Sequence, residues 1–146
     1  MFKQITVFLE NKPGRLEEVT ACLAGKNINL HALSIADTTD FGILRMIVSE
    51  PEKAELALKE KNFMVKTTSV IASAIGHSPG SLHKLLHELN TLDISIEYMY
   101  AFTSRHKDYD AIVILSLNNQ EAALEKLKNS NFSLLGEKLL DELNKA

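Results

Sequence analysis

The chain has 146 residues, of which 45% are hydrophobic and 24% are charged, and its formal net charge is −3. This balance excludes a disordered or collagen-like chain, and the acidic excess argues against nucleic-acid binding through phosphate contacts. One cysteine, Cys22, excludes an internal disulfide and a paired-cysteine zinc site, which favours a reducing, cytoplasmic compartment. No apolar run has the length of a membrane span, and the polar residues near the N-terminus do not fit a signal peptide.

The sequence contains an internal repeat. The segment Pro13-Gly14-Arg15-Leu16 matches Pro79-Gly80-Ser81-Leu82 at an offset of 66 residues, and Asn62-Phe63 matches Asn131-Phe132 at an offset of 69. Two copies are too few for a solenoid and therefore predict a duplicated module. The predicted domains are residues 1–69 and 70–136, followed by a helix that completes the chain over residues 137–146.

Each copy shows the same order of strand and helix patterns. Lys3–Leu9 alternates apolar and polar residues, as a half-buried strand does. A turn at Asn11–Gly14 follows, with Pro13 suited to the first helical position. The helix is expected to end at Gly25 and Asn27. The other elements of the first copy are predicted as strands over Asn29–Ala36, Gly42–Ser49 and Phe63–Thr68, a hairpin turn over Thr38–Asp40, and a helix over Glu52–Lys61.

The second copy repeats this order, and the final segment Gly136–Ala146 has leucines at helical spacing. Its predicted strands are Val70–Ile75, Ile94–Phe102, Tyr109–Leu117 and Phe132–Leu135, and its predicted helices are Pro79–Leu92 and Gln120–Lys128. The order β-α-β-β-α-β in each copy predicts an α+β protein made of tandem ferredoxin-like modules.

The second strand of each module is a sheet edge, and bare edges invite pairing. Joining the two edges would give one eight-stranded antiparallel sheet with the helices on one face. The strand 111–117 is apolar on both faces, so its helix-free face needs a cover. The last helix or a second molecule are the two candidates for that cover.

The loop before the first helix of each copy has the chemistry of an anion site. Asn11, Pro13 and Gly14 precede one helix, and His77, Ser78, Pro79 and Gly80 precede the other. Unpaired backbone N–H groups at a helix start can bind a carboxylate, and glycine lets a ligand approach closely. Ser78 could instead cap its own helix. In an edge-joined sheet, acceptors at Asn29 or Ser95 would face an ammonium group, which predicts a site for a free α-amino acid.

The motif Asn11-x-Pro-Gly-x-Leu, with Asn27-Ile28-Asn29 opening the next strand, resembles the ACT domain. The repeat over both copies resembles stand-alone bacterial proteins of two ACT domains. The resemblance implies a ligand between the first loop of one module and the second strand of the other. By position, Asn11, Gly14, Arg15 and Leu16 would face Ser95 and Ile96, whereas His77, Gly80, Ser81 and Leu82 would face Asn29 and Leu30. Because His77 and Ser95 replace asparagines, the two sites are chemically unequal.

The leading hypothesis is a non-enzymatic regulatory protein that binds a free amino acid, needs no cofactor or metal, and acts as a homodimer or on an enzyme of amino-acid metabolism. An assembly module that acts on a partner enzyme without binding a metabolite is the alternative, and an enzyme with an unrecognised site is the third hypothesis. His83 and His87 have metal-ligand spacing, but they point outward from the leucine stripe of their helix and indicate a solvated face.

Overall fold

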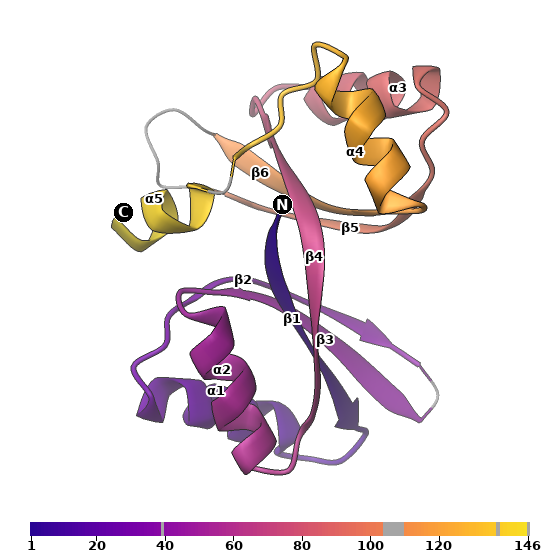
Figure 1. Cartoon of the computed structure of the whole chain (residues 1–146). Helices are drawn as coiled ribbons and strands as arrows, with labels where there is room; N and C mark the ends of the chain where they lie inside the picture. Colours follow the sequence, from indigo (N-terminus) through magenta and orange to yellow (C-terminus); the bar gives the residue numbers. More distant parts are fainter. Residues whose placement is uncertain (39, 104–109, 137, 146) are drawn as a thin grey trace. The chain divides into compact units, whose positions relative to one another are not determined.

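The computed structural model describes residues 1–38, 40–103, 110–136 and 138–145 (Figure 1). It contains two compact units, named here the N-terminal unit (Lys3–Ser69) and the C-terminal unit (Val70–Ala146 with Met1–Phe2). Thr39, Tyr109, Glu137 and Ala146, which the predicted turn, strand and last helix include, lie outside the described residues. The predicted α+β class is confirmed.

The N-terminal unit follows the predicted order of elements. They are β1 (Phe2–Glu10), α1 (Arg15–Gly25), β2 (Leu30–Asp37), β3 (Phe41–Val48), α2 (Pro51–Glu60) and the first part of β4 (Met64–Ile75). The strands pair in antiparallel register, so that Val7 and Ile35 both lie opposite Leu44. Leu44 packs with Val19 of α1 and Leu58 of α2, all three with no exposed surface. Alternate strand residues therefore form a core with one face of each helix.

The C-terminal unit has the second part of β4, α3 (Ser81–Thr91), β5 (Ile96–Thr103), β6 (Ala111–Leu117), α4 (Gln120–Lys128) and α5 (Leu139–Lys145). Its core packs Val113 and Leu115 of β6 against Leu89 and Leu127 of the helices. All seven residues of β6 are buried, which agrees with its apolar character on both faces. In Figure 1, α5 lies on the other side of β6 from α3 and α4, and its Leu139 is 2% exposed.

The strand order is β2-β3-β1-β4-β6-β5, which is six strands rather than eight. The predicted strands Phe63–Thr68 and Val70–Ile75 form the single strand β4, because Ser69 between them continues the extended backbone. The predicted strand Phe132–Leu135 is reduced to one bridge between Ser73 and Leu134. Among the described residues, β2 has only β3 and β5 has only β6 as strand neighbour, so the predicted eight-stranded sheet is not confirmed.

Candidate functional site

A type II turn shapes the loop between β1 and α1. The Arg15 amide donates to the Lys12 carbonyl at 3.4 Å. Pro13 occupies the second position of this turn, and Gly14 the third, with φ 85° and ψ −8°. Proline sets the angle that a type II turn needs at its second position, and glycine accepts the positive φ of the third. The prediction that Pro13 begins the helix is therefore wrong, because α1 starts at Arg15, after the turn.

The loop between β4 and α3 repeats this geometry. The Ser81 amide donates to the Ser78 carbonyl at 3.1 Å, Pro79 is the second residue of the turn, and Gly80 has φ 88° and ψ −7°. Neither Gly14 nor Gly80 offers a side chain that caps its helix. The amides of Arg15 and Ser81 are used in the turns. The next amides of α1 and α3 have no acceptor within their helices, so each helix start can receive a carboxylate.

The second loop surrounds a hollow of about 330 Å³. Five of the predicted site residues line it together with Ile75 and Gly76: His77, Ser78, Pro79, Ser81 and Leu82. The hydroxyls of Ser78 and Ser81 lie 2.9 Å apart and share a hydrogen bond. Ser78 therefore bonds to a side chain, whereas the N-cap position of α3 is Gly80 and carries no side-chain cap.

The basic side chain at the start of α1, Arg15, makes its contacts within the N-terminal unit. The Arg15 guanidinium lies 4.6 Å from the centre of the Phe63 ring, and its Nη1 bonds to Glu18 at 2.7 Å. The Nε of Arg15 is buried and meets no hydrogen-bond acceptor among the described residues. Leu16 is 39% exposed. The structure thus packs the Arg15 side chain against Phe63 and Glu18, and Leu16 remains accessible.

The second-strand residues have bonds inside their own units. The Asn29 carbonyl accepts from the Ser49 amide at 2.9 Å, and Asn29 Oδ1 accepts from the Leu30 amide at 3.0 Å. The Ser95 carbonyl accepts from the Asn118 amide at 2.9 Å. A carbonyl oxygen has two lone pairs, so one acceptor position remains on each carbonyl. Leu30 and Ile96 each pack against the core of their own unit. That a loop and the second strand of the other copy share a ligand stays a prediction.

The family described as "ACT domain pair" matches residues 1–144. The chain belongs to this family. The ACT resemblance inferred from the Pro-Gly loops is thereby confirmed, and this ACT domain pair also has close structural relatives. A Bacteroides thetaiotaomicron protein of known crystal structure is 45% identical, with 97% of this chain and 96% of that chain covered and a TM-score of 0.85.

The ligand-free regulatory subunit of aspartate kinase from Thermus thermophilus has the same fold as this ACT domain pair. It is 18% identical, with 87% of this chain and 91% of that chain covered and a TM-score of 0.61. The corresponding subunit from Thermus flavus is 16% identical, with coverage of 87% and 90% and a TM-score of 0.59. No curated protein sequence matches the chain.

Sequence reasoning missed one side chain at the second ACT loop. The His77 amide donates to Asp110 Oδ2 at 3.2 Å. The strand register explains this contact, since Ile75 lies opposite Ala111, which brings the residue before β6 next to the residues after Ile75. Predicting this contact requires the register in which β4 pairs with β6. The sequence separation of His77 and Asp110 does not indicate that register.

Outside the loops, His83 and His87 of α3 lie with their ring centres 6.0 Å apart. Over the described ranges, no three His, Cys, Asp or Glu side chains are grouped so that they could hold a metal ion. The search of the described residues also finds no helix that is long and apolar enough to span a membrane.

Proposed function

We propose that this ACT domain pair is a regulatory protein that binds a free amino acid at its Pro-Gly loops. The hollow at the second loop is the observation that carries the proposal. It combines a helix start without a side-chain cap with the hydroxyls of Ser78 and Ser81 and the apolar side chains of Ile75 and Leu82. The volume of about 330 Å³ lies at the lower end of the usual range for small-molecule pockets.

The two charged groups of an amino acid need opposite partners, and we assign these to the start of α3 and to Asp110, which contacts the second loop. An α-carboxylate at the start of α3 would accept hydrogen bonds from the amides of Leu82 and His83, which follow the Ser81 amide used in the turn and lie where the helix dipole is positive. The Asp110 carboxylate, bound to the His77 amide at 3.2 Å, adds negative charge that favours an ammonium group. The apolar wall formed by Ile75 and Leu82 would then receive an uncharged side chain.

Ligand binding would regulate by changing how the chain contacts a partner. A ligand shifts an equilibrium between two arrangements only by binding one of them better than the other. We propose a second copy of the chain, or an enzyme of amino-acid metabolism, as the partner whose contact changes, and a cytoplasmic setting. The known regulatory subunits of aspartate kinase share the fold, which supports this choice of partner class without showing it.

An assembly module without a metabolite is the second candidate function, and the exposed edge of the N-terminal unit favours it. Leu33 and Ile35 of β2 are 48% and 46% exposed, and Phe41 at the start of β3 is 50% exposed. Apolar side chains along a strand edge are a surface on which another strand can pair. Under this hypothesis, the contact itself regulates the partner.

A thermal denaturation series with free amino acids tests the proposal. The full chain is melted with each of the common amino acids at millimolar concentration, and a ligand at a hundred times its Kd should add about 2.7 kcal/mol of stability. His77→Ala should reduce the shift if the second loop holds the ligand. Asn11→Ala, at the equivalent place in the first loop, should reduce the shift if the first loop holds the ligand, so the two variants tell which loop is occupied. If no amino acid raises the melting temperature, the sensor function is wrong and the assembly module takes its place.

A further inference from the structure

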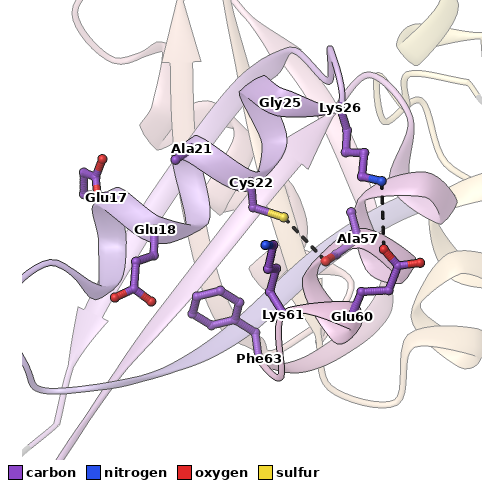
Figure 2. A pocket seen from close by; sticks show the side chains of 10 residues that line it. All are labelled: Glu17, Glu18, Ala21, Cys22, Gly25, Lys26, Ala57, Glu60, Lys61 and Phe63. Atoms are coloured by element: carbon purple, nitrogen blue, oxygen red, sulfur yellow. Dashed lines mark hydrogen bonds and ion pairs between the residues drawn. The ribbon is translucent and has the colours of Figure 1, made fainter.

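A second hollow, of about 690 Å³, lies in the N-terminal unit between α1 and α2 (Figure 2). It is lined by residues of α1 and α2, by the residue that follows each helix, and by Phe63: Glu17, Glu18, Ala21, Cys22, Gly25, Lys26, Ala57, Glu60, Lys61 and Phe63. We name it the helix hollow. Its lining includes none of the predicted loop residues, so it is separate from the amino-acid site proposed above.

Small side chains leave this space open. Ala21, Cys22 and Gly25 are the lining residues of α1 with little volume, and Ala57 faces them from α2. The Cys22 thiol lies 3.5 Å from the Ala57 carbonyl and donates a hydrogen bond to it, so the helices meet at this point. Ala57 is only 4% exposed and Phe63 only 6% exposed, which gives the helix hollow an apolar floor.

The C-terminal unit has larger side chains at the equivalent positions. At the repeat offsets of 66 and 69, the residues that correspond to Ala21, Cys22, Gly25 and Ala57 are His87, Glu88, Thr91 and Lys126. The Lys126 ammonium donates to the carbonyls of Leu92 and Asp93 at 2.8 and 3.2 Å, which bridges α4 and the end of α3. The two copies have therefore diverged at the positions that open the helix hollow, although their cores are alike.

Charges of both signs border the helix hollow. Figure 2 shows Glu17 and Glu18 at one end of it, Lys26 and Glu60 at the other, and Lys61 between them beside Phe63. Glu18 is paired with Arg15, and Lys26 with Glu60 at 3.9 Å. Within the residues that the structure describes, Glu17 and Lys61 have no ion partner. An acidic group at one end of the helix hollow and a basic group beside Phe63 are therefore left available.

We propose that the helix hollow binds a short peptide of four residues with free ends. The peptide's terminal ammonium would pair with Glu17 and Glu18, its terminal carboxylate with Lys61 and Lys26, and its apolar side chains would lie over Ala21 and Gly25. The helix rise separates positions 17 and 26 by about 13 Å, and an extended peptide of four residues reaches about 13 to 14 Å. A single amino acid is too short to contact both ends, which distinguishes this ligand from that of the loops.

Isothermal titration calorimetry of the full chain with the tetrapeptide Ala-Leu-Ala-Leu tests this proposal. The free-ended peptide should bind, and the same peptide with an acetylated N-terminus and an amidated C-terminus should bind about tenfold more weakly, because capping removes both terminal charges. Lys61→Gln should weaken the binding of the free-ended peptide about threefold. Lys128→Gln, at an exposed position of α4, is the matched control and should leave binding unchanged.

Ala57→Lys, which introduces the residue found at the equivalent position of the C-terminal unit, should abolish peptide binding by filling the space. Circular dichroism checks that this variant folds. If it does not fold, the binding measured for Lys61→Gln tests the peptide site. The proposal is overturned if neither peptide binds at millimolar concentration, if both peptides bind equally, or if Lys61→Gln binds like the natural chain. The melting-temperature response to free amino acids should be unchanged in Lys61→Gln, so the two proposals fail independently.

Discussion

At the scale of single residues, Gly14 and Gly80 decide how α1 and α3 begin. Both have φ near +85°, a region in which a side chain is strained. A Cβ built on either glycine meets no atom within 4 Å, so the strain comes from the backbone alone. We expect Gly14→Ala and Gly80→Ala each to lower the free energy of unfolding by about 1 to 2 kcal/mol, as measured by urea denaturation.

Gly25→Ala provides the control for these turn glycines. Gly25 is the last residue of α1, does not have a positive φ, and also has open space around its Cβ position. Alanine has a better helix propensity than glycine by about 1 kcal/mol in a helix interior, so this variant should be as stable as the natural chain or slightly more stable. If all three variants lose stability equally, backbone strain at the two turns is not the cause.

At the scale of elements, Glu55 joins α2 to β4. Its carboxylate accepts from Lys59 at 2.5 Å and from Thr67 at 2.6 Å. The hydrogen bond from Lys59, followed by the one from Thr67, lowers the pKa of Glu55 below its ordinary value. The unfolded chain therefore binds a proton on this group at a higher pH than the folded chain does, and the resulting stability is present above about pH 4.3.

We expect Glu55→Gln to lower the free energy of unfolding at pH 7. The difference from the natural chain should become smaller as the pH falls below about 4.3 and then below the lowered pKa of Glu55 in the folded chain. Urea denaturation of the natural chain and the variant at pH 7, 5 and 3 measures this difference. In a Lys59→Gln background the cost at pH 7 should be smaller, because the main cause of the shift is gone. A cost that stays constant from pH 7 to pH 3 contradicts the ionic origin.

The short helix α5 has seven residues and is too short to be stable by itself in water. Leu139, 2% exposed, is the residue through which it is buried. We expect Leu139→Ala to cost about 2 to 5 kcal/mol, seen as a lower denaturation midpoint. Asp141→Ala, an exposed position of the same helix, should change stability by less than about 0.5 kcal/mol. Equal effects of the two substitutions would show that the burial of Leu139 does not stabilise α5.

At the scale of the whole molecule, the duplication gives each unit its own core. Leu58 of α2 and Leu127 of α4 occupy equivalent positions and are 0% and 1% exposed, and they belong to separate core clusters. Leu58→Ala and Leu127→Ala should each cost about 2 to 5 kcal/mol. In native-state hydrogen exchange, each should lower protection most within its own unit. A uniform loss of protection over both units in either variant would contradict this expectation.

Most strands, turns and helices were predictable from local sequence patterns. The alternation in Lys3–Leu9, the Pro-Gly turns and the leucine stripe of α3 act over a few residues, so a sequence displays them directly. The same reasoning divided β4 at Ser69, although an extended backbone passes through a polar residue without a turn. It also placed Pro13 inside the helix, because proline is common both at helix starts and in type II turns.

The sequence by itself determined a duplicated α+β module with two Pro-Gly loops, because hydrophobic period and turn chemistry are local properties. Only the tertiary structure decided that Asp110 meets the His77 amide, that β4 is one strand, and that Ala57 and Cys22 border an open hollow. Strand register and helix packing are set by which distant side chains bury each other best. These features therefore depend on many weak contacts between distant residues, and they cannot be predicted from any short segment of the chain.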